Sequence, residues 1–472
     1  MKKTKIIATI GPASESKEVF AKLVKNGLNI ARLNFSHGGC EEQLPRIEMI
    51  KAYREETGLP IAILLDTKGP EIRTKTFKGG EITLVKGGEF TLTTRDIEGT
   101  TEACSITYEL LPKDVKSGDI ILINDGIIKL QVQKIEDRDI LCKVINGGNL
   151  KDKRGVNVPG IKTHLPAITD KDIKDIEFGI ANGVDFIAAS FIRSAEGVRQ
   201  IKEILKEHDA EYIKIISKIE CQEALDNLDE IIEESYGIMV ARGDLGVEIE
   251  TCKMPIVQKK IIEKCNSAGK PVITATHMLD SMINNPVPTR AEVTDVANAI
   301  YDGTDAVMLS GETTIGKYPI ETVKHMSDIA KATEHARKYS SILREKSKYK
   351  ELSIEDTVSY ATCSSAHDLN AKAIICPTAS GFTAGMVSKF TPKAPIYAFV
   401  NNEQVQRTVL LYSGVEPILF KKQDNVEQVI SETIKILKEK NKIKKDDLVI
   451  ITAGLPYVKK QITNMMKIHI VE

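Results

Sequence analysis

The sequence lacks three features that mark particular classes of protein: an excess of charge of one sign, paired cysteines and a long apolar run. Its formal net charge is −1 at pH 7, so the composition does not support a polyanion-binding surface, and we expect no nucleic-acid partner. The cysteines are scattered without a CxxC pair, which favours a reduced, cytoplasmic protein over a disulfide framework. They stand at positions 40, 104, 142, 221, 252, 265, 363 and 376.

The N-terminal stretch is basic and then apolar, like a weak signal peptide. Thr4, Lys5 and Thr9 interrupt its apolar part, which is too short for the core of such a signal. No apolar run elsewhere in the sequence is long enough to cross a bilayer, so we expect no membrane partner.

What the sequence does contain is a regular alternation of short β-branched runs and amphipathic stretches with helical spacing. Near-continuous apolar strands alternating with helices indicate a parallel sheet that is buried on both faces. Eight such units predict a closed (β/α)8 barrel. The eight runs are residues 4–11, 28–36, 60–67, 185–193, 212–220, 237–246, 271–279 and 305–313.

This rhythm changes twice along the chain. Residues 70–166 alternate polar and β-branched side chains between glycine pairs, which predicts an antiparallel β-domain inserted into a barrel loop. Strand-like and helical runs alternate again in residues 339–472, which predicts a separate α/β sheet domain. The barrel would then consist of residues 1–69 and 167–338.

Six of the eight predicted strands end in polar or charged residues that do not suit a core. In a (β/α)8 barrel the C-terminal strand ends converge on one mouth, which is where active sites lie. One polar strand end is usually the solvated start of a loop, but six together predict a site. The residues are Arg32, Asn34, Ser36, His37, Asp66, Thr67, Lys68, Lys218, Glu220, Arg242, Gly243, Asp244, Thr274, Thr276, His277, Ser310, Gly311 and Glu312.

Glu220 and Asp244 stand at matching ends of neighbouring strands with no histidine or cysteine beside them. Such a pair of carboxylates suits a hard divalent ion, above all Mg²⁺. The alternative is that Glu220 makes an ordinary ion pair with Lys218. Arg32, Arg73 and Lys218 are fixed cations, and together with a metal they indicate an anionic, phosphorylated substrate.

A second oxygen-rich set at the strand ends carries only one formal charge. It would suit a weakly held monovalent cation, although hydrogen bonds within the loops would explain the same residues. His277 could act as a general acid or be a packed polar residue. The set consists of Asn34, Ser36, Asp66 and Thr67.

Eight segments between residue 4 and about residue 320 closely resemble, in order, those of the pyruvate kinase family. They are TKIIATIGPAS, NIARLNFSHG, LLDTKGPEIRT, RGVNVPG, IISKIE, VARGDLGVE, PTRAEVTDVANAI and DGTDAVMLSGETTIGKYP. The inserted domain, a lid in that family, and the C-terminal regulatory domain occur where the family has them. The resemblance implies transfer of a phosphoryl group from phosphoenolpyruvate to ADP in glycolysis, by a cytoplasmic homotetramer.

The resemblance also implies roles for the residues of the predicted mouth. Glu220 and Asp244 match the protein ligands of the Mg²⁺ that binds phosphoenolpyruvate, and a second Mg²⁺ would arrive with the nucleotide. Lys218 matches the lysine that steadies the transferred phosphoryl group, and Arg32 matches a phosphate-binding arginine. The substrate carboxylate would bind the hydroxyl of Thr276 and the backbone of Ala241, Arg242, Gly243 and Asp244.

The second oxygen-rich set matches the K⁺ ligands of the family, and Glu71 is the choice associated with a need for K⁺. Nucleotide contacts would come from Asn34, Ser36, His37, Arg73 and Arg154.

For protonation of the enolate we expect a water relayed by Thr276 and Ser310. Lys218 is the other candidate donor, but a buried lysine beside a carboxylate and a metal should stay charged. The family commonly has glutamine at position 277, so His277 would add a titrating group to this relay.

In the C-terminal domain, TASGFTAG (378–385) resembles a loop that binds a phosphorylated activator. The alternative is a Ser/Gly turn that opens a helix. Ala379 and Phe382 stand where basic residues are common, so a sugar monophosphate or AMP suits the loop as well as a sugar bisphosphate. The candidate effector residues are Thr378, Ser380, Gly381, Phe382 and Thr383. Because the sequence ends at Glu472, we expect no extra C-terminal domain of the kind that some bacterial members carry.

Two other classes of function fit a barrel of this kind. A carbon–carbon lyase would use a Schiff-base lysine or a metal-bound enolate, but it needs no nucleotide lid such as the inserted domain with Arg73 and Arg154. A non-catalytic barrel would be expected to have lost at least one residue of the predicted site. The five residues whose loss would indicate such a protein are all present: Arg32, Lys218, Glu220, Asp244 and Thr276.

Overall fold

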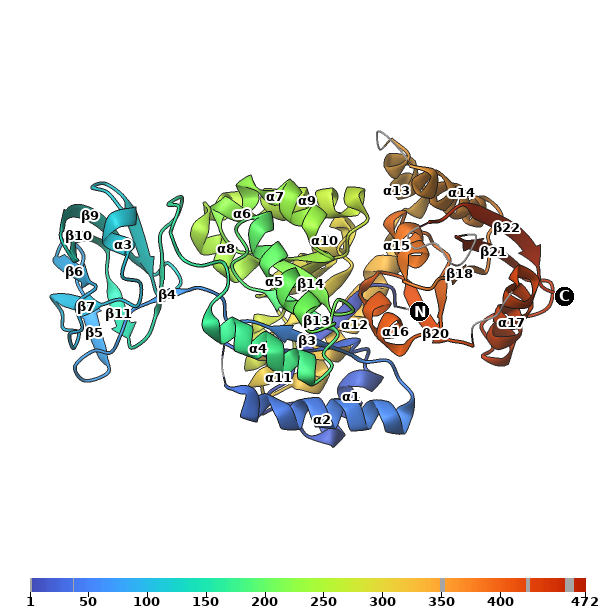
Figure 1. Cartoon of the computed structure of the whole chain (residues 1–472), viewed down its shortest axis with the longest axis horizontal. Coiled ribbons are helices and arrows are strands. Elements are labelled where there is room, and N and C mark those ends of the chain that lie inside the picture. Colours follow the sequence, from blue (N-terminus) through green and yellow to red (C-terminus); the bar gives the residue numbers. More distant parts are fainter. Residues whose placement is uncertain (1, 37, 349–352, 422–424, 455–461) are drawn as a thin grey trace.

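The computed structural model describes residues 2–36, 38–348, 353–421, 425–454 and 462–472. Figure 1 shows three parts in a row: the inserted β-domain on the left, the barrel in the centre and the C-terminal domain on the right. No helix among the described residues combines the length and the apolar character needed to span a membrane.

Eight parallel strands close into a barrel in the order β1-β17-β16-β15-β14-β13-β3-β2, which confirms the predicted (β/α)8 fold. Each strand is shorter than the apolar run that predicted it, because the polar residues at its end lie in the following loop or helix. The strands are β1 (Lys5–Thr9), β2 (Ile30–Asn34), β3 (Ala62–Asp66), β13 (Phe186–Ala189), β14 (Lys214–Ile219), β15 (Gly237–Ala241), β16 (Val272–Ala275) and β17 (Ala306–Leu309).

The helices that surround the barrel begin and end at recognisable capping residues. Capping boxes at Thr169 and Thr289 start α4 and α10, and Gly303 ends α10 at a φ of 107°. The surrounding helices are α1 (Lys17–Lys25), α2 (Cys40–Thr57), α4 (Asp170–Ala181), α5 (Ala195–Glu207), α7 (Leu228–Glu234), α9 (Met254–Ala268), α10 (Arg290–Asp302) and α12 (Pro319–Ala336). Short helices lie at α6 (Gln222–Asp226), α8 (Arg242–Glu248) and α11 (Gly311–Thr314).

Alternate residues of each barrel strand point into the barrel, where apolar side chains fill its interior. Ile30, Leu64 and Ile216 belong to this interior cluster. Two residues further along the same strands stand Arg32, Asp66 and Lys218. Because side chains on a strand alternate with period two, these charged groups form the next interior layer, at the mouth of the barrel.

The inserted domain is a curled seven-stranded sheet in the order β4-β12-β8-β9-β10-β6-β7, with a separate pair β11-β5. Most of its strands pair antiparallel as predicted, but β6 and β7 pair parallel. Its apolar face packs around Phe90, Ile121 and Leu130. The strands are β4 (Ile72–Arg73), β5 (Glu81–Leu84), β6 (Glu89–Thr93), β7 (Ala103–Ser105), β8 (Ile120–Ile123), β9 (Ile128–Glu136), β10 (Asp139–Asn146), β11 (Gly148–Lys151) and β12 (Gly155–Asn157), with one short helix, α3 (Leu111–Asp114).

The C-terminal domain is a five-stranded sheet in the order β20-β19-β18-β21-β22, in which β22 runs antiparallel to β21. This confirms the predicted α/β sheet domain. Its strands are β18 (Ala373–Pro377), β19 (Ile396–Val400), β20 (Val415–Leu419), β21 (Leu448–Ala453) and β22 (Met465–Ile470). Its helices are α13 (Tyr339–Lys346), α14 (Ile354–Asp368), α15 (Phe382–Lys389), α16 (Glu403–Thr408) and α17 (Val426–Glu439).

A buried carboxylate joins the C-terminal domain to the barrel. Asp185, which is 2% exposed, accepts from Arg407 Nε of α16 at 2.6 Å and from Arg54 of α2 at 2.9 Å. It also accepts the backbone N–H of Ile63 at 2.8 Å. These bonds tie the start of β13 to helices of both domains.

Candidate active site

Asp66 is the centre of a buried charge network at the mouth of the barrel. Its Oδ2 accepts a hydrogen bond from Arg32 Nε at 2.7 Å, and its Oδ1 accepts one from Lys218 Nζ at 3.1 Å. Lys218 Nζ also lies 2.9 Å from Glu220 Oε1. Positive and negative groups therefore alternate along this series of contacts, which runs from Arg32 through Asp66 and Lys218 to Glu220.

The partners of Lys218 and Asp66 keep these two groups ionised. Burial alone would lower the pKa of Lys218, but Asp66 and Glu220 outweigh it and raise that pKa above its ordinary value. Burial would likewise raise the pKa of Asp66, but Arg32 and Lys218 hold it below its usual range. At neutral pH the site therefore presents a fixed ammonium that does not give up its proton.

Glu220 is 1% exposed, and its Oε2 accepts the backbone N–H of Phe191 at 2.5 Å. Burial and the nearby carboxylate of Asp244 raise the pKa of Glu220 to about 7, although Lys218 acts in the opposite direction. The Lys218–Glu220 ion pair expected as an alternative is thus present. The carboxylate of Asp244 nevertheless lies close enough to disfavour the charged form of Glu220. The ion pair with Lys218 is therefore compatible with a cation bound between Glu220 and Asp244.

Asp244 lies in the first turn of α8 and not on a strand. The prediction of a strand over residues 237–246 is wrong beyond Ala241, where β15 ends and α8 begins. The side chain of Arg242 turns away from the mouth and donates to the Thr276 carbonyl at 2.7 Å and to Asp295 at 2.8 Å. This turn leaves the backbone N–H groups of the first turn of α8 facing the end of β16.

Gly243 and Thr276 meet at this point. The Gly243 N–H donates to Thr276 Oγ1 at 2.8 Å, and that hydroxyl donates to the Ala275 carbonyl at 2.6 Å. Thr276 has a φ of 65°, and Phe191, beside Glu220, has a φ of 54°. A left-handed backbone is rare for bulky or β-branched residues and persists where the surrounding structure enforces it, as at active sites.

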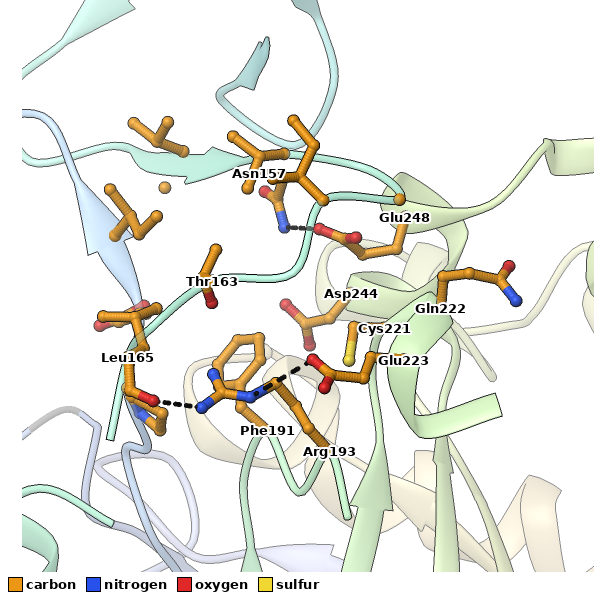
Figure 2. Close-up of a pocket in the computed structure, with 18 of the residues that line it drawn as sticks. Asn157, Thr163, Leu165, Phe191, Arg193, Cys221, Gln222, Glu223, Asp244 and Glu248 are labelled. Atoms are coloured by element: carbon orange, nitrogen blue, oxygen red, sulfur yellow. Dashed lines mark hydrogen bonds and ion pairs between the residues drawn. The ribbon is translucent and has the colours of Figure 1, made fainter. Parts of the chain in front are cut away.

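A cavity of about 330 Å³ lies between the mouth and the inserted domain. Figure 2 shows Asp244, Cys221 and Glu223 on its barrel side and Asn157 and Thr163 on the side of the inserted domain. Asn157 Nδ2 donates to Glu248 Oε1 of α8 at 2.9 Å across this cavity, so the inserted domain touches the helix that carries Asp244.

Arg73 and Arg154 both line the cavity, but among the described residues only Arg73 has a carboxylate partner. Arg73 makes a double hydrogen bond to Glu71 at 2.6 and 2.8 Å. The buried Nε of Arg154 has no hydrogen-bond partner among the described residues. Arg154 is therefore a candidate to bind an anionic ligand in this cavity. His37, which was predicted beside them, lies outside the described residues.

The second oxygen-rich set gathers at the ends of β2 and β3. Asn34 pairs in register with Asp66, and Asn34 Oδ1 accepts the N–H of Ser36 at 3.1 Å. Thr67 Oγ1 accepts the N–H of Ser190 at 3.1 Å. The alternative interpretation, that these residues make hydrogen bonds within the loops, therefore holds for Asn34 and Thr67.

Ser310 and His277 follow the neighbouring strands β17 and β16. The Ser310 N–H donates to Glu312 Oε2 at 2.7 Å, and the Ser310 carbonyl accepts from Thr314 Oγ1 at 2.7 Å. His277 is exposed and has a φ of 51°. Its ring lies against Gly243, about 3.7 Å from where a Cβ would stand. The histidine thus lies at the mouth beside Thr276 and is not packed into the core.

The candidate effector loop opens α15. Gly381 has a φ of 84°, and a Cβ there would come within 2.2 Å of Val409, so only glycine fits. Thr378 Oγ1 accepts the N–H of Gly381 at 3.1 Å, and the buried Thr383 hydroxyl accepts from Thr463 at 3.0 Å. Ser380 is exposed and Phe382 is half-buried, so the open part of this loop is Ser380 with the backbone around it.

Two residues of the network were missed in the sequence. Ser190 follows β13, and its hydroxyl accepts from Lys218 Nζ at 2.6 Å and donates to the Thr67 carbonyl at 2.6 Å. Thr9 ends β1, and its Oγ1 accepts from Arg32 at 2.7 Å. Both are polar residues at strand ends, so the pattern that singled out the other six strands would have found them.

Comparison with known proteins gives consistent results over the whole chain. A family model described as "Pyruvate kinase, barrel domain" matches residues 1–323, and one described as "Pyruvate kinase, alpha/beta domain" matches residues 356–469. The chain is 50% identical to a pyruvate kinase of Staphylococcus saprophyticus and 49% identical to one of Geobacillus stearothermophilus, covering 100% of this chain and 81% and 80% of those proteins. A crystal structure of a pyruvate kinase from Cryptosporidium parvum superimposes with a TM-score of 0.95 at 40% identity, covering 100% of this chain and 96% of that one.

Proposed function

This chain belongs to the pyruvate kinase family and transfers the phosphoryl group of phosphoenolpyruvate to ADP, giving pyruvate and ATP, and we propose that the charge network around Asp66 is the machinery of this transfer. The observation that carries the proposal is the buried Lys218 ammonium, which Asp66 and Glu220 keep protonated. A fixed cation of this kind stabilises the negative charge on a phosphoryl group in transit without reorganising during the reaction.

Arg32 would share this role at the same layer of the barrel. It is 8% exposed, and its Nε and one terminal nitrogen are held by Asp66 and Thr9. The remaining N–H groups are available to a phosphate oxygen, and the two bonds fix the plane of the guanidinium before substrate arrives.

Glu220 and Asp244 would hold a divalent cation, most suitably Mg²⁺. The fit rests on their chemistry: both are carboxylates, and burial together with the charge of Asp244 raises the pKa of Glu220, which a bound cation would counter. Two protein ligands leave most of an octahedral shell to water and substrate oxygens. When bound, the cation would supply positive charge that neutralises the phosphate and enolate oxygens.

We further propose that K⁺ binds the oxygen set of Asn34, Ser36, Asp66 and Thr67. The register of Asn34 with Asp66 supports this, because it puts an amide residue and a carboxylate residue side by side at the ends of neighbouring strands. Glu71, which pairs with Arg73 at 2.6 Å, adds no cation to the site.

The nucleotide would bind between the barrel and the inserted domain. Arg154 supports this placement, because its buried Nε has no hydrogen-bond partner in the part of the chain that the structure describes, and because it lines the cavity together with Arg73. Asn34, Ser36 and His37 would complete the nucleotide contacts. The Asn157–Glu248 bond supports a lid role for the inserted domain, since it links that domain to the helix bearing Asp244.

For the second half-reaction we propose that a water held by Thr276 and Ser310 protonates the enolate carbon. Lys218 is unsuited to this step because its neighbours raise its pKa. The backbone of Ala241, Arg242, Gly243 and Asp244 would bind the substrate carboxylate, which would take the place that Thr276 Oγ1 now has on the Gly243 N–H.

The remaining proposals concern regulation, assembly and location. A phosphorylated effector would bind at Ser380 and the backbone around Thr378, Gly381, Phe382 and Thr383. A homotetramer is supported by β22, an edge strand on which Ile468 and Ile470 are 47% and 60% exposed. All eight cysteines are free, which supports a cytoplasmic location.

An assay of ADP-dependent pyruvate formation, coupled to reduction of the pyruvate, tests the cation proposals. We expect activity only when Mg²⁺ and K⁺ are both present, with tetramethylammonium as the control monovalent cation. Full activity in tetramethylammonium would reject the K⁺ site, and full activity in the presence of a chelator would reject the Mg²⁺ site. Glu220→Gln should raise the Mg²⁺ requirement. Glu223→Gln, which changes a carboxylate that lines the barrel side of the cavity and pairs with Arg193, should leave it unchanged.

A further inference from the structure

Two arginines in the described part of the chain have a buried Nε without a hydrogen-bond partner. One is Arg154, which lines the active-site cavity where nucleotide phosphates would bind. The other is Arg337, which follows α12 at the opposite end of the barrel and is 8% exposed. A buried guanidinium without a partner is costly, so Arg337 requires an explanation of its own.

Arg337 lines a small polar cavity in the seam between the barrel and the C-terminal domain. The barrel contributes Asn266, Lys270 and Asp305, and the C-terminal domain contributes Lys389 and Ser413. The cavity has a volume of about 10 Å³. This is room for one water-sized species, which excludes a sugar, a nucleotide or a phosphate group.

The charges around this cavity do not balance within the protein. Lys270 Nζ donates to the backbone carbonyls of Glu233 at 3.1 Å and Ser235 at 2.6 Å. Lys346, which is 9% exposed, donates to Asn266 Oδ1 at 2.9 Å, to Thr391 Oγ1 at 2.9 Å and to the Lys389 carbonyl. Among the described residues, neither lysine nor Arg337 makes an ion pair with a carboxylate.

Asp305 is the one carboxylate among the described residues that line the cavity, and backbone groups occupy both of its oxygens. Oδ1 accepts the N–H of Ser413 at 3.0 Å, and Oδ2 accepts the N–H of Val272 at 3.0 Å. It forms no ion pair with Arg337. The seam therefore holds more positive charge than its carboxylate offsets.

We propose that this cavity is a binding site for one monatomic anion of the halide class, held by Arg337 between the barrel and the C-terminal domain. The anion would accept from Arg337 Nε and offset the positive charge of Arg337, Lys270 and Lys346. A monatomic ion is the smallest species that carries a full negative charge, and that charge would offset the positive side chains around the cavity.

The state of Lys346 agrees with this proposal. Burial and the neighbouring Arg337 lower the pKa of Lys346 to about 7, so without an added negative charge the lysine is only partly protonated near neutrality. Because the lining residues come from both domains, a bound anion would also stabilise the docking of the C-terminal domain on the barrel.

The test is thermal unfolding of the full chain at constant K⁺ concentration and ionic strength, with the anion changed from gluconate to chloride or bromide. We expect a saturable rise in Tm of about 2–4 °C with either halide. Arg337→Leu should remove this rise, whereas Arg344→Leu, which changes an exposed arginine of the adjacent α13, should retain it. No saturable rise, or an equal rise in the Arg337→Leu variant, would mean that water fills the cavity and would overturn the proposal.

A second measurement does not depend on whether the variants fold. In crystals of the wild-type chain grown with bromide, we expect an anomalous peak within hydrogen-bond distance of Arg337 Nε at millimolar bromide. A cavity that contains only water, or a bromide that appears only at molar concentration, would reject a built anion site.

Discussion

Lys218→Met is the substitution that most directly separates the two halves of the reaction. It removes an ammonium that lies 3.1 Å from Asp66 and 2.9 Å from Glu220 and leaves an unbranched side chain of similar length. Because those partners raise the pKa of Lys218, its charge is fully present at every pH below about 10.5, the ordinary lysine value, and is lost only above the raised value. The loss of charge in the variant therefore affects the whole physiological pH range.

Two magnitudes follow from this geometry. Removal of one electrostatic stabiliser of a transition state lowers kcat by about 10²–10³, and a cation placed on a transferring phosphoryl group contributes about 10³–10⁵. We therefore expect phosphoryl transfer to fall at least about 10³-fold. Breaking a buried ion pair costs about 3–5 kcal/mol in the free energy of unfolding. We expect the lower end of that range, because Asp66 keeps Arg32 at 2.7 Å.

The assay compares pyruvate formation with the detritiation of pyruvate, which reports only the protonation step. If a water held by Thr276 and Ser310 is the donor, detritiation should stay within about tenfold of wild type, because an essential general acid would contribute about 10²–10⁴. Equal loss of both activities would refute this reasoning and would identify Lys218 as the proton donor. Lys214→Met, at the other end of β14, is the matched control and should leave both activities intact, and a thermal melt of each variant checks that it has folded.

Three further predictions test other contacts. Asp185→Asn should weaken docking of the C-terminal domain and lower the free energy of unfolding by about 3–5 kcal/mol in a denaturant titration, because it breaks the buried pair with Arg407 at 2.6 Å; an unchanged midpoint would contradict this. His277→Gln should change the pH profile of kcat, because glutamine cannot exchange a proton with the relay as an imidazole can, and identical profiles would show that His277 takes no part in the relay. Asn157→Ala should raise KM for phosphoenolpyruvate by about tenfold, because a hydrogen bond to a charged group such as Glu248 contributes about 1.5–3 kcal/mol, and unchanged steady-state kinetics would show that this contact does not hold the lid.

The barrel could be predicted from sequence because its determinants are local and periodic. Runs such as PIAILLDT are apolar on both faces, and only a strand covered on both sides buries them. The parallel pairing of β6 with β7 and the start of α8 at Arg242 were not predictable in this way. The first depends on which segment lies beside β6, and the second is accompanied by contacts of Gly243 and Arg242 with the loop after β16. Alternation along one strand contains neither kind of information.

For the site, the residue types at the strand ends predicted the charged members but not their pairing. Asp66 was expected as a ligand of a monovalent cation, yet it also joins Arg32 to Lys218. Arg242 was expected to offer its backbone to the substrate, and the role of its side chain, which holds the loop after β16, was not predicted. These differences arise because each side chain has several partners within reach, and only the packed barrel decides which of them it meets.

The sequence by itself determined that an ammonium and a carboxylate, Lys218 and Glu220, stand together at the end of an apolar strand, because period-two alternation places them on one face. Only the tertiary structure decided that this face points into the barrel mouth. Closure of eight strands brings Asp66 from β3 to Lys218 on β14 across 152 residues of chain, and the carboxylates of Asp66 and Glu220 outweigh burial and keep Lys218 charged. A strand can specify which groups it presents, but the partners that fix their ionisation come from elsewhere in the fold.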